Sequence, residues 1–240
     1  SHIAIETTFG NLRYFKRLPE GTECAVATSK VINLSDVFGD SDQTNKFVTR
    51  YLQSTHCDLF FADAAILVEG VAESMLLPHF IRSKFPELYQ RYITILGVNG
   101  RHAHRLSPLI EKLCLPTLVI TDLDPAEKEG YHKSVVPKRG EGQISGNYAI
   151  AKWLMKEKDI DKLVDYSEDK KEFSFASPYR FSIRLAYQTP VKVDFEGEEK
   201  EAIPGTFEDC LIYTNYDLFK KIKVTDSGNL VEQTHDLLNS

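Results

Sequence analysis

Three short apolar runs, separated by helix-like stretches, most constrain how this chain can fold. The runs are "AAILV" at 64–68, "YITILG" at 92–97 and "PTLVI" at 116–120. Each is too short for a buried helix and has the aliphatic content of a strand that is covered on both faces. Two successive strand–helix–strand units predict an α/β fold of Rossmann-like type, in which helices flank a mainly parallel sheet with right-handed crossovers.

The stretches between these runs have helical periodicity. "RLSPLIEKL" at 105–113 predicts one helix, and "ESMLLPHFIRSKF" at 73–85 predicts another. Pro78 fits that helix only if it lies near the first turn, because a later proline removes a backbone hydrogen bond. The apolar stripe expected on the 73–85 helix consists of Leu76, Leu77, Phe80, Ile81 and Phe85.

Acidic residues follow the first and third apolar runs. Glu69 and Glu73 come after the first, and Asp122 and Asp124 come after the third. Because ligands of parallel sheets bind beyond the carboxyl ends of the strands, we expect the four side chains to share one site. Two carboxylates about 4 Å apart repel by roughly 4 kcal/mol at an effective dielectric constant near 20. Hard divalent cations such as Mg²⁺ are the natural counter-charge, so the pattern predicts a metal site.

Each of these acids also has an ordinary structural explanation when it is taken alone. Strands often end in solvent, where a charge is at home. Glu73 would lie near a helix N-terminus, where the helix dipole favours negative charge. Asp124 precedes Pro125, which is good turn chemistry.

Composition limits the possible classes of protein. The 240 residues, 42% of them hydrophobic, suffice for one large domain or two small ones. The net charge of −6 gives no general attraction to nucleic acid, which argues against a passive DNA-coating role but not against an enzyme with a metal-filled acidic site. The cysteines form no CxxC pair, so neither zinc nor a disulfide framework is indicated. No apolar stretch is long enough to span a membrane and no signal peptide is visible, so a cytoplasmic location is expected.

The remainder of the chain predicts a mixture of elements. "CAVATSKVINL" at 24–34 resembles a strand, and residues 44–63 begin with a helical pattern. "GNYAIAKWLMKE" at 146–157, "DIDKLVDY" at 159–166 and "SPYRFSIRLAYQ" at 177–188 are interpreted as helices of an insertion. "VKVDFEGEEKEAIP" at 191–204 predicts a hairpin that turns at Glu196–Gly197, and the stretch from 206 is interpreted as a closing amphipathic segment.

Several longer blocks resemble one known family. They are "FFADAAILVEGVAESMLLP", "LGVNGRHAHRLSPLIEKL", "PTLVITDLDP", "SGNYAIAKWL" and "PGTFEDCLIYTN". A Glu after one strand and a DxD after a later one is typical of a Toprim domain, and the full set resembles the C-terminal nuclease region of the OLD (overcoming lysogenization defect) family. That family joins an ABC-type ATPase to a Toprim nuclease in bacterial and phage proteins.

The resemblance implies how the chain is organised and what it binds. Residues 1–57 would be the tail of an ATPase domain and a linker, because "SHIA" resembles the end of an ATPase core. Residues 58–140 would be the first part of the Toprim core, 141–190 a helical insertion, and 191–240 the closing segment and tail. No P-loop motif occurs in this sequence, so no ATP site is expected. The implied partners are double-stranded DNA and the N-terminal ATPase domain, with a possible oligomer through that domain and no membrane.

The resemblance also assigns roles to individual residues. Two Mg²⁺ or Mn²⁺ ions would be held by the four acids, and Glu73 would assist proton transfer. Glu208 would be a further ligand or simply an acid at a helix N-terminus. Ser145 and Asn147 would contact metal-bound water or phosphate, or would cap the following helix. Catalytic lysine candidates are Lys220, Lys221 and Lys223.

Basic residues near these blocks are candidates for contacts with DNA phosphates, although a solvated surface explains them equally well. They are Arg101, His102, His104, Arg105, Lys133, Lys138 and Arg139. The expected activity is metal-dependent nicking or cutting of DNA with little sequence preference, by two-metal-ion hydrolysis. One rival is a phosphatase or phospho-acceptor domain, in which Asp122 would be the nucleophile. The other is a non-catalytic module whose acids bind a structural ion or a partner.

Overall fold

The computed structural model describes residues 11–18, 20, 25–35, 37, 56–98, 102–128, 134–176, 179–195 and 197–220. The chain divides into two units, and each is formed by two separate stretches of sequence. Unit 1 consists of Ser1–Ile120 and Asp169–Leu185, and unit 2 consists of Thr121–Glu168 and Ala186–Ser240. The helix expected within residues 44–55 lies outside the described residues.

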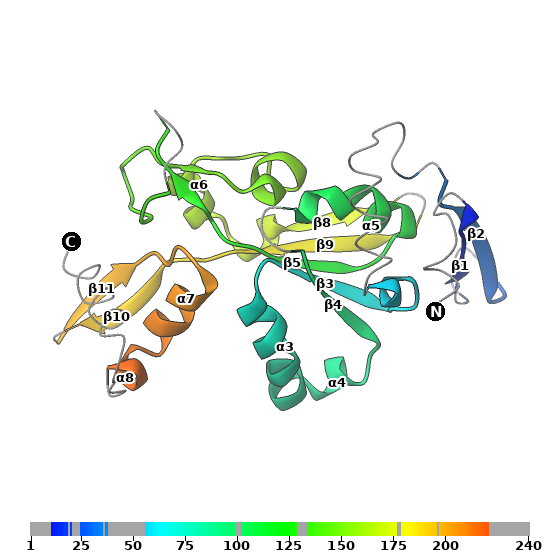
Figure 1. Ribbon diagram of the computed structural model, residues 1–240, viewed down its shortest axis with the longest axis horizontal. Coiled ribbons are helices and arrows are strands. Elements are labelled where there is room, and N and C mark those ends of the chain that lie inside the picture. Colours follow the sequence, from blue (N-terminus) through cyan, green and yellow to red (C-terminus); the bar gives the residue numbers. More distant parts are fainter. Residues whose placement is uncertain are drawn as a thin grey trace. The chain divides into compact units, whose positions relative to one another are not determined.

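Unit 1 contains a five-stranded sheet in the order β4-β3-β5-β9-β8 (Figure 1). Three adjacent strands of this sheet, β4, β3 and β5, correspond to the three apolar runs, and β3 pairs in parallel with both β4 and β5. The register places Val68 beside Gly97 on one side and beside Ile120 on the other. The predicted parallel α/β sheet is therefore confirmed. The strands are β3 (Ala64–Val68), β4 (Ile93–Gly97), β5 (Thr117–Ile120), β8 (Glu172–Phe175) and β9 (Phe181–Ala186).

Helices connect the parallel strands. The chain moves outward from β3 to β4 and then back across β3 to β5, so right-handed crossovers put the two connections on opposite faces of the sheet. Figure 1 shows α3 and α5 on opposite sides of these strands. The fully buried side chains of the strands and of α5 include Leu67, Leu96, Val119, Leu109 and Ile110. The connecting elements are α3 (Val71–Lys84), α4 (Pro86–Tyr89), η3 (Ala103–Leu106) and α5 (Ser107–Leu113).

Helix α3 differs from its sequence-based expectation in two ways. Pro78 lies in the interior of the 14-residue helix and not in its first turn, because the helix begins at Val71, directly after Gly70 and two residues before the expected start. The apolar stripe is only partly buried: four of its residues are half-buried, Phe85 is 57% exposed, and the buried residue of the helix is Glu73. The best-shielded position on α3 therefore belongs to a carboxylate.

The segment at 177–188 was expected to be a helix of the insertion, and that expectation is wrong. Residues Phe181–Ala186 form strand β9, which pairs antiparallel with β8. The side chains of Phe181, Ile183 and Leu185 are buried, while Arg184 between them is exposed. This alternation with a period of two residues is that of a strand, and it outweighs the i,i+4 relation of Phe181 and Leu185.

Unit 2 contains two small two-stranded sheets and several helical segments. Strand β6 pairs with β7, and β10 pairs antiparallel with β11, which confirms the predicted hairpin. Gly197 has a φ of 85°, which a tight hairpin turn requires and glycine adopts without strain. The helix expected at 146–157 forms only as the short helical segment η4, and the helix expected at 159–166 forms as α6. The elements are β6 (Pro125–Ala126), β7 (Ile144–Ser145), η4 (Ala149–Trp153), α6 (Ile160–Asp165), β10 (Val191–Phe195), β11 (Glu198–Ala202), α7 (Phe207–Thr214) and α8 (Tyr216–Phe219).

The first described strands of unit 1 form an antiparallel pair. Strands β1 (Arg13–Leu18) and β2 (Thr28–Asn33) pair along their full length, and β2 lies within the strand expected at 24–34. The short helical segments η2 (Cys57–Phe60) and η5 (Glu168–Lys171) complete the described elements. Over the described part of the chain, no helix combines the length and the apolar character that crossing a membrane would require.

Candidate metal and nucleic-acid site

The first pair of predicted site residues surrounds the turn from β3 into α3 in unit 1. Glu69 directly follows the last residue of β3 and is half-buried. Gly70 is the N-cap of α3, and Glu73 lies in its first turn with only 3% of its surface exposed. A Cβ atom on Gly70 would lie 2.6 Å from Oε2 of Glu73. The absence of a side chain at position 70 therefore makes room for the Glu73 carboxylate.

His102, a predicted DNA contact, interacts electrostatically with Glu69 of this first pair. Burial lowers the pKa of its imidazole, the nearby positive charge of Arg105 lowers it further, and the negative charge of Glu69 opposes both effects. The imidazole is therefore predominantly neutral at pH 7. His102 would meet a phosphate as a neutral hydrogen-bond donor, whereas Arg105 would meet it as a cation.

The second pair of predicted site residues lies in unit 2, in the loop that follows β5. Asp122 and Asp124 are both half-buried. Oδ1 of Asp122 accepts a hydrogen bond from Nε2 of Gln188. Oδ2 of Asp124 accepts one of 3.1 Å from Nδ2 of Asn147. Asp124 has a φ of 48°, a left-handed conformation that Asp tolerates better than most residues.

Asn147 is fully buried and has two functions in this unit. Its Oδ1 accepts a 3.0 Å hydrogen bond from the backbone N–H of Ala149, two residues on, which is the pattern of an Asx turn. Its Nδ2 donates to the Thr121 hydroxyl at 2.8 Å, in addition to the bond to Asp124. The buried Ser145 Oγ accepts a 3.1 Å bond from the Asn147 backbone N–H. Asn147 thus lies one residue before Tyr148, the N-cap of η4, and its amide also bonds an acid of the DxD.

The later acidic block surrounds the beginning of α7, also in unit 2. Glu208 is exposed in the first turn of that helix. Its neighbour Asp209 forms a capping box with Thr206 and also accepts the backbone N–H of Gly205 at 3.1 Å. Asp209 and Asp124 line one cavity of about 350 Å³. In the "TFEDC" block, the acid that shares a cavity with the DxD is thus Asp209, which the sequence did not single out.

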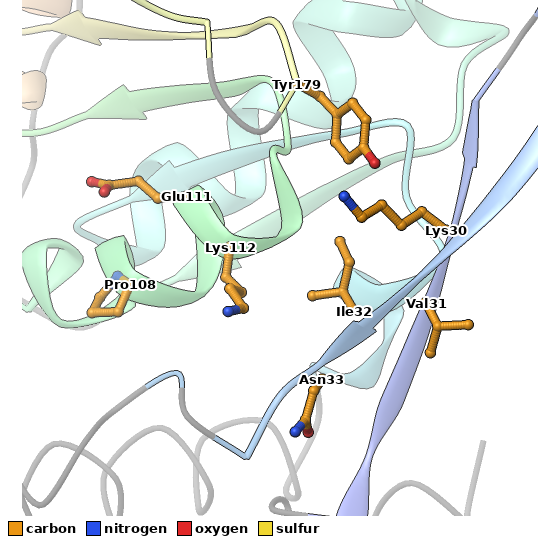
Figure 2. A pocket seen from close by; sticks show the side chains of 8 residues that line it. All are labelled: Lys30, Val31, Ile32, Asn33, Pro108, Glu111, Lys112 and Tyr179. Atoms are coloured by element: carbon orange, nitrogen blue, oxygen red, sulfur yellow. The ribbon is translucent and has the colours of Figure 1, made fainter. Parts of the chain in front are cut away.

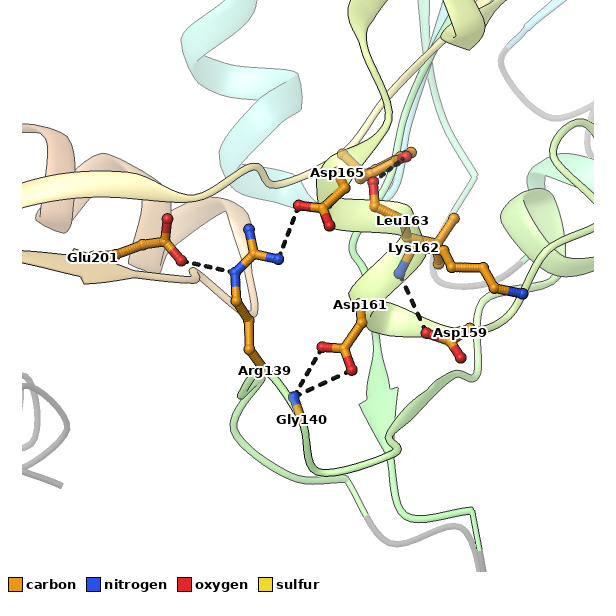
Figure 3. A network of polar contacts seen from close by, with 9 residues as sticks. Arg139, Gly140, Asp159, Asp161, Lys162, Leu163, Asp165 and Glu201 are labelled. Carbon is orange, nitrogen blue, oxygen red and sulfur yellow. Dashed lines mark hydrogen bonds and ion pairs between the residues drawn. The ribbon is translucent and has the colours of Figure 1, made fainter.

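Arg139, another predicted DNA contact, is engaged within unit 2 (Figure 3). Its Nε contacts Glu201 and its Nη1 contacts Asp165, both at 2.8 Å. The hydrogen bond to Glu201 makes the largest contribution to the raised pKa of the guanidinium, and the hydrogen bond to Asp165 raises this pKa further. The backbone N–H of the adjacent Gly140 bonds the carboxylate of Asp161. Two carboxylates already balance the Arg139 charge, which weakens its attraction to a phosphate.

The other predicted basic residues differ in their surroundings. Lys138 is exposed, and its backbone N–H bonds the side chain of Gln143. Lys220 is exposed and forms an ion pair with Asp217. Arg101, Lys133, Lys221 and Lys223 lie outside the described residues.

The carboxylates are not gathered into a preformed metal cage within either unit. Over the residues that the structure describes, no three His, Cys, Asp or Glu side chains form a group that could hold a metal ion. The chemistry of the donors nevertheless fits a hard divalent cation, because Glu69 and Glu73 in unit 1 and the DxD in unit 2 all offer carboxylate oxygens.

A larger cavity, of about 510 Å³, lies elsewhere in unit 1 (Figure 2). Lys30 and Tyr179 face each other across it, with the Lys30 Nζ 5.2 Å from the centre of the Tyr179 ring. Its other lining residues are Val31, Ile32, Asn33, Pro108, Glu111 and Lys112. Two lysines and one glutamate make it a poor site for a divalent cation, and none of its lining residues is a predicted site residue.

Comparison with known proteins agrees with the sequence blocks. Residues 60–124 match the family model "Overcoming lysogenization defect protein-like, TOPRIM domain". The chain is also 27% identical, over an alignment 251 positions long, to "Endonuclease GajA" of Bacillus cereus (strain HuB5-5). That alignment covers 98% of this chain but 33% of the relative, so the chain spans about a third of the length of the curated relative it matches. The matched segment contains Glu69, Glu73, Asp122 and Asp124, and residues 60–124 of this chain therefore carry a Toprim domain of the OLD-like type.

Proposed function

We propose that this chain is the nuclease part of a larger protein and hydrolyses DNA phosphodiesters with the help of divalent cations. Glu69, Glu73, Asp122 and Asp124 are the proposed ligands, and Mg²⁺ or Mn²⁺ the proposed ions. The product would be nicked or cut double-stranded DNA. The relative named as an endonuclease supports this activity, and the Toprim match supports the use of a divalent metal.

One observation carries the proposal, namely the parallel register of β3 and β5. Val68 and Ile120 are partners in that register, so the chain leaves both strands at the same edge of the sheet. Glu69 follows Val68 directly, and Asp122 comes two residues after Ile120. This connectivity supports a shared site at the carboxyl edge, where parallel sheets bind their ligands.

The side chains of the chain itself would hold the substrate and move a proton. A divalent cation, when bound, supplies positive charge beside the scissile phosphate and makes a nearby water more acidic. Glu73 is shielded from solvent, and the positive end of the α3 dipole favours the ionised carboxylate that would accept the proton of an attacking water. His102 and Arg105 suit the binding of the phosphate backbone. A lysine, with Lys220 and Lys221 as the candidates, would offset developing charge.

The partners are proposed on the same basis. Since the relative is about three times as long as the aligned region, an ATPase part in the same protein is a reasonable partner, and assembly into an oligomer would occur through that part. The overall charge of −6 implies that binding to DNA depends on local basic residues and on cations.

The decisive experiment incubates the purified chain with supercoiled plasmid and Mn²⁺ or Mg²⁺, and follows conversion to nicked and linear forms. Wild-type protein should convert the plasmid, and EDTA should stop the reaction. Glu73→Gln and Asp122→Asn should each reduce the rate at least about 100-fold, because each removes a charge that the reaction requires. The matched controls are Glu87→Gln on the exposed surface of α4 and Asp165→Asn on α6, which should keep the wild-type rate.

The rival functions give different results in the same experiment. Release of phosphate from a small phosphomonoester, together with a phosphorylated Asp122, would indicate phosphatase-type chemistry. An inert plasmid, combined with an Asp122→Asn variant that differs from wild type only in melting temperature, would indicate a non-catalytic module. Nicking that persists undiminished in both Glu73→Gln and Asp122→Asn would refute the proposed site.

A further inference from the structure

We infer that Gln188, a residue outside the acidic blocks, is the positioning residue of the first aspartate of the DxD. This inference rests on the proposed function, because it concerns the same carboxylates. Gln188 lies two residues after the end of β9 and is 66 positions from Asp122 in the sequence. Only 7% of its surface is exposed.

The amide of Gln188 can lie in only one orientation. Its Oε1 accepts a 2.8 Å hydrogen bond from the backbone N–H of Leu123, and a backbone N–H is only ever a donor. The NH₂ end must therefore face the other way, where it donates to Oδ1 of Asp122. One side chain thus holds both the carboxylate of Asp122 and the backbone of the next residue.

The neighbouring residues of the loop are held in the same manner, all within unit 2. The backbone N–H of Thr121 bonds the carbonyl of Ala186 at 3.0 Å, just before Gln188 in the chain. At the other end, the carbonyl of Asp124 accepts the N–H of Gly146 at 2.8 Å. Every residue from 121 to 124 therefore has a hydrogen bond to a segment distant in sequence. Such a loop presents its carboxylates in a fixed direction.

The choice of glutamine matters chemically. A neutral amide orients a carboxylate without cancelling its negative charge, whereas a lysine or arginine in this place would compete with a cation for it. Hydrogen bonds of this kind, to groups that ligate a metal, typically change metal affinity by about 10- to 100-fold when they are removed. Gln188 therefore orients Asp122 without offering a positive charge that would compete with a cation.

A second buried glutamine of unit 2 provides a matched comparison. Gln143 is 8% exposed, accepts the backbone N–H of Lys138 at 2.9 Å and donates to the carbonyl of Val136 at 2.9 Å. It is as buried as Gln188 and accepts from the backbone in the same way, but its donor bonds a carbonyl and not a carboxylate. Removal of either amide should destabilise unit 2 to a similar extent, while only removal of Gln188 should affect the binding of a cation.

The test compares Gln188→Met with Gln143→Met, since methionine keeps the length of the side chain but has no N–H donor. Binding of Mn²⁺ is measured from the electron paramagnetic resonance signal of the free ion, and melting of the metal-free protein is measured in parallel. We expect Gln188→Met to raise the Kd for Mn²⁺ about 10- to 100-fold and Gln143→Met to leave it within about twofold, with similar losses in melting temperature. The Mn²⁺ concentration for half-maximal nicking should rise in the same proportion, while the KM for plasmid stays unchanged.

Each outcome has a distinct meaning. If Gln188→Met binds Mn²⁺ as wild type does, or if Gln143→Met weakens binding equally, the positioning role is refuted although the proposed function stands. If wild-type protein binds no Mn²⁺ at all, the proposed function fails and the positioning role fails with it. Should Gln188→Met not fold, Gln188→Asn decides, because its shorter amide cannot reach both partners and must also raise the Kd for Mn²⁺.

Discussion

Replacement of Gly70 by alanine is the most specific perturbation of the acidic site in unit 1. The new Cβ would lie 2.6 Å from Oε2 of Glu73, a distance that real Cβ contacts do not show. To reach an ordinary contact of 3.4 Å, the carboxylate must retreat by about 0.8 Å. Since Glu73 is buried, it cannot retreat by simply turning out into solvent.

The cost to folding should be small. Gly70 has a φ of −119° and a ψ of 177°, an extended conformation that any residue adopts, so alanine introduces no backbone strain. As an N-cap, alanine is less favourable than glycine and destabilises the folded protein by roughly 0.5–1 kcal/mol. It also reduces the conformational freedom of the unfolded chain, which stabilises the folded protein by about 0.4–1 kcal/mol. These terms nearly cancel, and the shift of about 0.8 Å falls on the far end of a flexible side chain, where it costs little, so the melting temperature should change by no more than about 4 °C.

The cost to the reaction should be large. A displacement near 1 Å in a catalytic group typically reduces a rate by about 100-fold. We therefore expect Gly70→Ala to nick plasmid about 100 times more slowly than wild type in Mn²⁺, at nearly unchanged thermal stability. Gly70→Ser carries the same Cβ but is a good N-cap, so it should be at least as stable as wild type and equally impaired.

Gly97→Ala is the matched control on the adjacent strand. Its Cβ would meet the Ser74 hydroxyl at 3.2 Å and not a carboxylate, so only a small shift of that side chain is needed. It should keep most of the wild-type rate. Wild-type nicking by Gly70→Ala, or a loss of activity that only parallels a loss of stability, would show that the position of the Glu73 carboxylate does not matter.

Two further predictions concern stability. Arg139→Ala should lower the free energy of unfolding by about 1 kcal/mol in urea, because it removes the contacts with Asp165 and Glu201, and the loss should shrink in 1 M NaCl; an equal effect of Lys138→Ala would contradict the importance of the two ion pairs. Burial raises the pKa of Tyr213 to about 12, with a smaller contribution from Asp209. Because the unfolded tyrosine loses its proton near pH 10 and the folded one does not, stability should fall between pH 10 and 12 by up to about 1.4 kcal/mol per pH unit. Tyr213→Phe should reduce that slope in denaturation curves, and an unchanged slope would refute the assignment.

The parallel part of the sheet could be predicted from the sequence because its strands are short, aliphatic and separated by helical periods. The antiparallel part could not, because "FSIRLA" satisfies both a period of two and an i,i+4 relation in only six residues. The position of Pro78 within its helix could not be predicted for a related reason. Local rules locate a proline relative to a helix start, but the start of α3 is determined by the turn at Gly70.

The acids of the candidate site could be predicted because strand ends in a parallel sheet have a common edge. Their supporting amides could not. Gln188 stands in "AYQTP", a segment with no acidic, glycine-rich or metal-ligand pattern, and only the tertiary structure brings it to Asp122. The sequence indicates Asn147 as a candidate helix cap, but the hydrogen bond from its side chain to Asp124 spans 23 positions and leaves no local signal.

The long-range bonds of the DxD loop have a consequence for the order in which the protein matures on the ribosome. The strands β3, β4 and β5 are complete once residue 120 has been made, but the partner of Asp122 follows 66 residues later. At the usual speeds of translation, that interval lasts about 3–13 s. During this time a nascent chain already contains its four acids, yet the Gln188 bonds that hold Asp122 and Leu123 cannot have formed. The acidic loop therefore acquires its final geometry only after Gln188 has been made, well after its own acids and the three parallel strands.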